Sequence, residues 1–126
     1  MRFGTFLEFP CPPGADTAQA YAHAFEHVDQ AEAAGLDIVD VAEFHFTPAR
    51  VVSSPVTLAA AIAGRTKRIK VGTSVLVLPL GNPIRMAEET ATLDHVSQGR
   101  FELGVGRSGF QVSYDGYGIA YEESRD

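Results

Sequence analysis

Cysteine and long apolar runs are scarce in this sequence. Its 126 residues contain a single cysteine, Cys11, so an internal disulfide is impossible, which fits a reducing cytosol. The most apolar run, residues 71–80, is too short to span a bilayer and is interrupted by Gly72 and Pro79. The first residues lack the charged start, apolar block and cleavage site of a signal peptide. We therefore expect a cytoplasmic protein with no membrane-spanning segment.

Positive charge is scarce as well. Ten Lys and Arg stand against sixteen Asp and Glu, and the net charge of −6 comes without any basic cluster. Such a chain repels phosphate backbones, so we expect no nucleic-acid partner. Hydrophobic residues make up 45% of the chain, enough for a folded core. No linker or low-complexity stretch divides it, which predicts one domain over residues 1–126.

Apolar segments recur along the chain at intervals typical of βαβ units, roughly 30–35 residues. They cover residues 2–9, 37–42, 69–78 and 101–105. Most are continuous rather than alternating, as expected of strands covered on both faces in a parallel sheet.

Helix signals fill the intervals. Asp16 with Gln19 three residues later resembles a capping box, and Gly35 ends the first helix. Its predicted apolar face consists of Ala18, Tyr21, Ala22, Phe25 and Val28.

The second and third helices share another start signal. Ser54 and Asn82 each precede a proline, which predicts a side-chain cap followed by proline in the first turn. Gly64 and Gly99 are the predicted ends.

Strand–helix repetition of this kind predicts an α/β fold with a parallel sheet and right-handed crossovers. An open doubly wound sheet and a closed barrel both fit, and four strands would be half of a barrel. Either architecture places its active site at the carboxyl ends of the strands. The loops expected to carry function are therefore residues 10–15, 43–53, 79–82 and 106–117.

A G-x-G-x-x-G motif occupies residues 104–109. A dinucleotide fold needs this motif to open a helix directly after a strand. Residues 110–118 contain three aromatics and two glycines without a helical stripe, so we favour a strand end that continues as a glycine-rich loop. Arg107 in this loop suits either bidentate phosphate binding or a solvated surface position.

Other candidate residues carry weaker signals. Glu43 and His45 follow the second strand, where they suit acid–base chemistry, although spacing alone favours a histidine packed against aromatics. His23 and His27 are spaced to share a metal, but without a further ligand a solvated or packing role is favoured and no metal site is predicted. Cys11 has no partner that would make it a nucleophile.

Several segments resemble the bacterial luciferase-like flavin monooxygenases. They are AEFHF (42–46), GRTKRIKVGT (64–73), NPIRMAEE (82–89) and LDHVSQGRF (93–101). The opening MRFG and the closing EESR (122–125) are similar to the luciferase alpha chain in particular. The family fold is a (β/α)8 TIM barrel of well over twice this length. The resemblance therefore implies that residues 1–126 are the N-terminal half of the barrel domain, with about its first four βα units.

The resemblance also implies a chemistry. Family members use reduced FMN, usually supplied by a separate flavin reductase, and O2 to oxygenate a small organic substrate through a flavin C4a-hydroperoxide. Related barrels use the deazaflavin F420 for hydride transfer, so an F420-dependent oxidoreductase is one alternative. A non-catalytic partner subunit or truncated half-barrel is another, because the missing strands should carry much of the site.

Cofactor-binding residues follow from the same resemblance. Arg107 matches the arginine that binds the flavin phosphate in the luciferase alpha chain. Ser74-Val75 falls where the family has a non-proline cis peptide beside the flavin ring. The resemblance thus places the flavin against Thr73, Ser74, Val75 and Leu76.

Two further family features bear on catalysis and assembly. Phe44 stands where the luciferase alpha chain has a catalytic histidine, which leaves His45 and Glu43 as the acid–base candidates. The helices after the second and third strands form a dimer interface in the family, which predicts a homo- or heterodimer. Small residues that would allow close packing there, or would face the barrel instead, are Ala59, Ala60, Ala61, Ala87 and Ala91.

Overall fold

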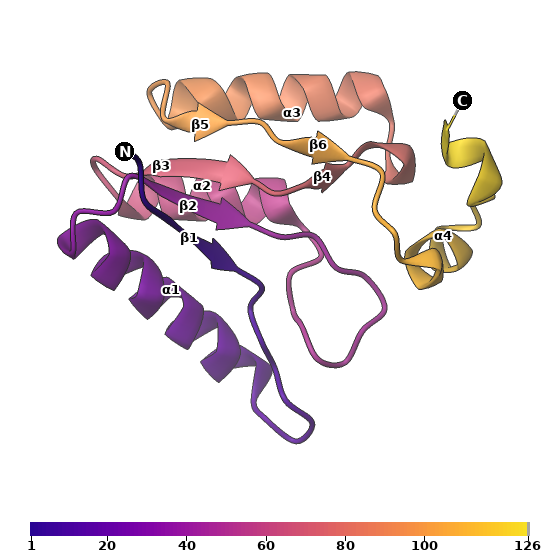
Figure 1. Cartoon of the computed structure of the whole chain (residues 1–126), viewed down its shortest axis with the longest axis horizontal. Helices are drawn as coiled ribbons and strands as arrows, with labels where there is room; N and C mark the ends of the chain where they lie inside the picture. The colour runs from indigo at the N-terminus through magenta and orange to yellow at the C-terminus, as the bar shows by residue number, and fades with distance from the viewer. Residues whose placement is uncertain (126) are drawn as a thin grey trace.

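A parallel sheet forms the centre of the computed structural model, which describes residues 1–125 (Figure 1). Its strand order is β1-β2-β3-β5. The strands are β1 (Gly4–Leu7), β2 (Ile38–Val41), β3 (Lys70–Thr73) and β5 (Phe101–Glu102). A second parallel pair joins β4 (Leu76–Val77) to β6 (Val105–Gly106). The parallel βα repeat predicted from the sequence is confirmed.

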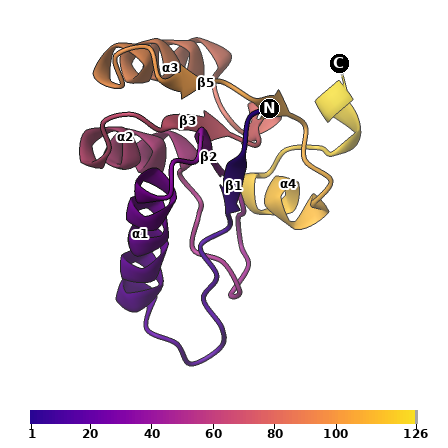
Figure 2. The same ribbon diagram turned by 60° about the vertical axis from the view of Figure 1, so that its left-hand side comes forward.

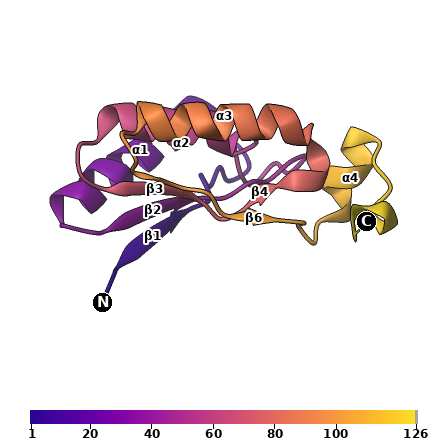
Figure 3. The same ribbon diagram turned by 90° about the horizontal axis from the view of Figure 1, so that it is seen from above.

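Three long helices cover one face of the sheet and leave the other face bare (Figures 2 and 3). They are α1 (Thr17–Ala33), α2 (Pro55–Arg65) and α3 (Pro83–Val96). The short helix α4 (Gln111–Tyr117) and two 3-10 turns, Leu78–Leu80 and Glu122–Arg125, lie at the carboxyl ends of the strands. No helix in the described part of the chain combines the length and the apolar character needed to cross a membrane.

The main core lies between the sheet and the helices. Strand residues Val39 and Val71 pack there with Ile62 of α2, and all three are fully buried. The bare face shows the opposite pattern. Phe6 is 50% exposed, and the Glu102 carboxylate pairs with Arg2 at 2.9 Å and with Lys70 Nζ at 2.6 Å.

Asp40 lies on the same bare face, and its titration predicts a measurable effect. Burial raises the pKa of Asp40, and the nearby charge of Glu102 raises it further. Ionised Asp40 therefore lowers stability at pH values above its folded pKa, and this cost is absent below its ordinary pKa of 3.8. We expect Asp40→Asn to raise Tm at pH 7 and the gain to vanish as the pH falls to about 4. Calorimetry at both pH values checks this, and a gain that persists at acid pH would contradict it.

The charge of Glu102 provides the opposite case. Hydrogen bonds from Lys70 and then from Arg2 lower the pKa of the Glu102 carboxyl. Its contribution to stability is present above the ordinary pKa and is lost as the pH falls through the folded value. Glu102→Gln should therefore lower Tm at pH 7, which makes it the matched control for Asp40→Asn.

Two predicted strands are each split by a bend. Residues 69–78 divide into β3 and β4 at Ser74-Val75, and this bond is cis, as the resemblance predicts. Residues 101–105 divide into β5 and β6 opposite the same point. The Thr73 hydroxyl donates to Gly104 O at 2.8 Å and accepts from Gly104 N at 3.1 Å, so it replaces the interrupted ladder.

The buried face of α1 differs from the predicted one. Val28 is buried, and Tyr21 and Phe25 pack against the core, but Ala18 and Ala22 are exposed. The buried stripe is Ala20, Ala24, Val28 and Ala31. Small alanines let the helix approach the sheet closely, while the aromatic rings cover its flank. The Asp16 cap is confirmed, because its carboxylate accepts from Ala18 N at 3.0 Å.

The predicted caps of α2 and α3 have different outcomes. Asn82 caps α3 by accepting from Ile84 N and Arg85 N. Ser54 does not cap α2, because its hydroxyl bonds the Thr57 hydroxyl at 2.8 Å instead. The chain turns at Gly99 with φ +75°, as expected beyond the end of α3.

The end of α2 also differs from the prediction. The helix passes Gly64 and ends at Arg65. The guanidinium of Arg100 donates to the carbonyls of Ala63 and Thr66, so no terminal glycine is needed to expose them to water.

The prediction that residues 110–117 form only a loop is wrong, because α4 occupies most of this segment. The sequence of α4 has no apolar stripe at helical spacing, so the local pattern does not predict a helix. Tyr114 is fully buried, and Gly116 lies so close to the Phe46 ring that a Cβ there would overlap it. Gly118 ends the helix in a left-handed conformation with φ +68°.

Candidate functional site

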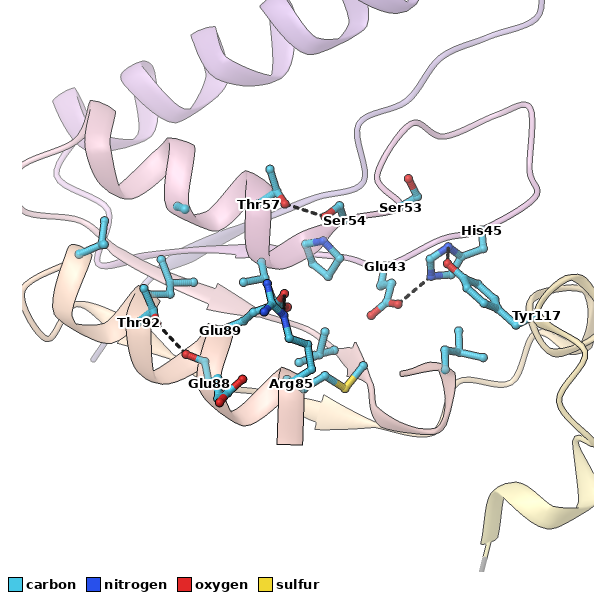
Figure 4. Close-up of a pocket in the computed structure, with 18 residues that line it drawn as sticks. Glu43, His45, Ser53, Ser54, Thr57, Arg85, Glu88, Glu89, Thr92 and Tyr117 are labelled. Carbon is cyan, nitrogen blue, oxygen red and sulfur yellow. Dashed lines mark hydrogen bonds and ion pairs between the residues drawn. The ribbon is translucent and has the colours of Figure 1, made fainter. Parts of the chain in front are cut away.

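Glu43 and His45 form a buried pair at the carboxyl end of β2 (Figure 4). His45 Nε2 lies 2.7 Å from Glu43 Oε1, and each side chain is 5% exposed. The other carboxylate oxygen, Glu43 Oε2, accepts from the backbone N–H of Val77 at 2.7 Å. The pair therefore ties the loop after β2 to β4, directly after the bend.

Tyr117 of α4 completes this cluster. Its hydroxyl lies 3.3 Å from His45 Nδ1, and the two rings meet edge to face at 5.0 Å. Because a carboxylate only accepts, the proton of a neutral His45 sits on Nε2. His45 Nδ1 then accepts from the Tyr117 hydroxyl. The structure thus brings the two predicted acid–base residues together and adds a tyrosine that the sequence analysis did not select.

Phe44 gives no replacement for the histidine that the family carries at this position. Its ring lies 4.5 Å below the Arg50 guanidinium and 5.5 Å from the Phe110 ring. A phenyl ring neither donates nor accepts a proton, so Glu43 and His45 stay the acid–base candidates of this loop.

A cavity of about 570 Å³ opens beside the pair, between α2 and α3. Glu43, His45 and Tyr117 lie at one end, and Figure 4 shows the ion pair of Arg85 and Glu89 at its wall, 2.7 Å between charged atoms. Of the predicted flavin-binding residues, only Leu76 lines this cavity. The cavity is therefore a groove between α2 and α3 that is separate from most of the predicted flavin-binding residues.

The predicted flavin-binding residues gather on two adjacent strands. Leu76 pairs with Val105 and Val77 with Gly106, so Arg107 follows directly after the strand that lies beside β4. Close approach at the bend depends on glycine. A Cβ on Gly104 would overlap the carbonyl oxygen of Thr73.

Only part of the predicted ring-binding segment is accessible. Thr73 and Leu76 are buried, and the Thr73 hydroxyl is engaged with Gly104. Ser74 is exposed and Val75 is partly exposed, so of the predicted segment only these two residues are accessible to a ligand.

Arg107 is held on both sides by tyrosines. Its guanidinium lies over the Tyr121 ring at 4.3 Å, and its backbone carbonyl accepts from the Tyr114 hydroxyl. Among the described side chains, which do not include those of residues 123, 125 and 126, the guanidinium has no salt-bridge or hydrogen-bond partner. A guanidinium stacked through its face keeps its N–H edges directed outward, which suits an anionic group such as a phosphate.

A comparison with protein families decides the identity. The family model described as luciferase-like monooxygenase matches residues 1–126. This chain belongs to the luciferase-like monooxygenase family. The resemblance stated from the sequence is confirmed, and the sheet is part of a (β/α)8 barrel.

Individual luciferase-like proteins support the same placement. The chain is 32% identical over 126 residues to the alkanal monooxygenase alpha chain of a Kryptophanaron alfredi symbiont, covering 100% of this chain and 35% of the relative. A monooxygenase from Streptomyces bottropensis superposes with a TM-score of 0.91 at 30% identity, over 99% of this chain and 39% of that one.

Two more distant structures share the fold. The oxygenating constituent of 3,6-diketocamphane monooxygenase from Pseudomonas putida, in complex with FMN, gives a TM-score of 0.89 at 23% identity, covering 98% of this chain and 37% of that one. The F420-dependent tetrahydromethanopterin reductase from Methanopyrus kandleri gives 0.69 at 23%, covering 94% and 30%. The chain thus spans about a third of the length of the relatives it matches.

The candidate site includes three tyrosines that the sequence analysis missed. Tyr114, Tyr117 and Tyr121 contact Arg107 or His45. Their signal in the sequence is an aromatic-rich segment directly after the glycine motif. Judged by local pattern alone, an aromatic-rich segment with glycines does not predict a helix. In the folded chain its aromatic rings pack against His45 and against one another.

The weaker candidates stay outside this site. His23 and His27 are exposed on α1, and the side chains that the structure describes include no group of three His, Cys, Asp or Glu placed to hold a metal ion. Cys11 is buried in the first loop, with Sγ 3.9 Å from Ala15 O.

Proposed function

We propose that this luciferase-like chain is the N-terminal half of a barrel enzyme that uses reduced FMN and O2 to oxygenate a small organic substrate. One observation carries the proposal. A stacked guanidinium, Arg107, lies at the carboxyl end of β6, which pairs with β4 directly after the bend at Ser74-Val75. A bound reduced flavin would supply the reactivity toward O2, and a separate flavin reductase would deliver it.

Each part of the chain then has a defined task. Arg107 binds the phosphate, and the Ser74-Val75 peptide supports the ring. Gly104 and Gly106 keep Cβ atoms out of the space beside the bend. Glu43 holds β4 through the Val77 amide and fixes the proton of His45 on Nε2, which leaves His45 Nδ1 as the acid–base atom that accepts from the Tyr117 hydroxyl.

Removal of the Arg107 charge tests the proposal in the complete polypeptide. Arg107→Ala should weaken FMN binding by about 10- to 150-fold, because charge-assisted hydrogen bonds to the phosphate are lost. Riboflavin, which lacks the phosphate, should bind both proteins equally. Arg65→Ala, which removes a surface arginine paired with Asp29 at 2.6 Å, is the control and should change neither affinity. Unchanged FMN affinity in Arg107→Ala would remove Arg107 from this role.

Two alternatives are tested by the same titrations. The likeness to the F420-dependent reductase shows the fold alone, so F420-dependent hydride transfer predicts binding of F420 in place of FMN. A non-catalytic partner subunit predicts binding of neither cofactor.

The dimer predicted from the resemblance is also part of the proposal. Ala59 is buried in the main core and does not take part, and Ala61, Ala87 and Ala91 are exposed. Ala60 lines the groove between α2 and α3. A groove flanked by two helices accepts a second pair of helices, so we place the dimer contact along it.

A pair of substitutions on α3 distinguishes the groove from the rest of the helix. Thr92 is exposed and lines the groove, whereas Ala91 is exposed and does not. We expect Thr92→Arg to convert dimers to monomers at micromolar concentration, and Ala91→Arg to leave the dimer intact. Analytical ultracentrifugation measures both. Dissociation by Ala91→Arg alone would place the contact on the alanine side of α3.

A further inference from the structure

Tyr121 contacts both the Arg107 side chain and a small hydrophobic cluster formed by Val77, Leu80 and Tyr114. The Arg107 guanidinium carbon lies 4.3 Å above the centre of the Tyr121 ring. The same ring meets the Tyr114 ring edge to face at 4.9 Å and 87°. Tyr114 is fully buried, and its hydroxyl donates to the backbone carbonyl of Arg107. Arg107 is therefore fixed at its backbone by one tyrosine and at its charged end by the other.

This arrangement changes what Arg107 offers to a ligand. A free arginine side chain samples many rotamers, and ordering it reduces the affinity for an anion. Stacking uses the face of the guanidinium, whereas a phosphate is bound by the N–H groups along its edge. The ring can thus hold the guanidinium without competing with a phosphate.

The hydrophobic cluster that holds Tyr121 also includes a residue of β4, the strand that follows the predicted ring-binding bend. Tyr121 packs against the cluster of Val77, Leu80 and Tyr114, and Val77 belongs to β4, which follows the cis peptide. Ile119 packs against the same cluster but makes no stacking contact with Arg107. Packing against this cluster therefore holds the Tyr121 ring in place beneath the Arg107 guanidinium.

We propose that Tyr121 is a positioning residue for phosphate recognition: its ring orients the Arg107 guanidinium and so increases the preference for FMN over riboflavin. The inference rests on the proposed function, because it assumes that Arg107 meets the flavin phosphate. It assigns to Tyr121 a role in discrimination and not in general packing.

Titrations of FMN and riboflavin into the complete polypeptide test this role. Tyr121→Leu removes the π face and should weaken FMN binding by about three- to tenfold without changing riboflavin binding. Tyr121→Phe keeps the ring and should bind both flavins as the parent protein does. Ile119→Ala removes packing from the same cluster and should leave the ratio of the two affinities unchanged. In an Arg107→Ala background, Tyr121→Leu should have no further effect.

Several results would overturn the role of Tyr121. One is equal weakening of FMN and riboflavin by Tyr121→Leu, which is the result of a structural role. Another is the same loss of FMN affinity with Arg107 already removed. If the parent protein binds FMN and Tyr121→Leu binds it equally well, this inference fails and the proposed function stands. If the folded parent protein binds neither flavin, both fail together.

Discussion

Replacement of Glu43 by leucine should lower the free energy of unfolding by about 2–5 kcal/mol, because two buried donors lose their acceptor at once. These donors are the Val77 amide and His45 Nε2, which lie 2.7 Å from separate oxygens of the Glu43 carboxylate. Leucine cannot accept from either, and the side chains of Glu43 and His45 are each only 5% exposed, so water does not easily take the place of the carboxylate. Urea unfolding followed by circular dichroism measures the loss.

Glu43→Gln is the matched control. The amide oxygen can accept from Val77 N, and the amide nitrogen can donate to His45 Nε2 if the imidazole proton moves to Nδ1. The imidazole would then donate to the Tyr117 hydroxyl, which lies 3.3 Å from Nδ1. We expect a loss of under about 1.5 kcal/mol, together with a change from the Nε2–H to the Nδ1–H tautomer in ¹⁵N NMR spectra. An unchanged tautomer, or equal losses in the two variants, would contradict the assigned network.

Gly104→Ala should destabilise the protein by about 3 kcal/mol, since the added methyl group meets backbone and not a movable side chain. The atom it would overlap is the carbonyl oxygen of Thr73, at the bend between β3 and β4. To relieve this overlap, the segment at Gly104 must move away from the bend between β3 and β4. That movement also breaks the hydrogen bond from Leu76 N to Gly104 O at 2.8 Å. Thermal unfolding measures the effect, and FMN affinity should fall with it.

Gly64→Ala controls for the loss of glycine itself. Gly64 lies in α2, and no atom outside its own helix backbone and chain neighbours comes within 4 Å of the place an alanine Cβ would take. Alanine there should raise stability by about 0.5–1 kcal/mol, because glycine is a poor helix former. Equal stability changes at positions 64 and 104 would show that the close approach at the bend does not constrain the fold.

The repeat of strands and helices was predictable because it depends on local pattern. Apolar segments and helix caps such as Asp16 and Asn82 act through neighbours in the sequence. The bends were not predictable from pattern. Residues 69–78 form one continuous apolar segment, and nothing in their composition marks the cis bond, which was expected only from the family resemblance. Gly104 stands within a motif typical of dinucleotide binding, although its role is to admit Thr73.

Tertiary contacts explain the helix ends that were predicted wrongly. Ser54 has the side chain of a cap, but the Thr57 hydroxyl competes for it. The last turn of α2 extends past Gly64 because Arg100, from a distant part of the chain, donates to its final carbonyls. Such partners are set by the folded arrangement and leave no trace in the local sequence.

The candidate site shows the same division. Glu43 and His45 are neighbours in one loop and were selected together as candidates, although spacing alone favoured a histidine packed against aromatics, and the structure shows both contacts. Their remaining partners, Val77 and Tyr117, are 34 residues from Glu43 and 72 residues from His45. Arg107 was selected by its place at a strand end and by the resemblance, whereas Tyr121 becomes significant only when its ring is seen against the guanidinium.

Flavin binding by the 126-residue chain tests the central claim most directly. FMN, first oxidised and then reduced under anaerobic conditions, would be titrated into the chain and followed by fluorescence. We predict saturable binding that is tighter for reduced FMN and is lost in Arg107→Ala. A chain that is folded by circular dichroism and binds neither form would contradict the claim that Arg107 and the bend at Ser74-Val75 are sufficient to form a flavin site.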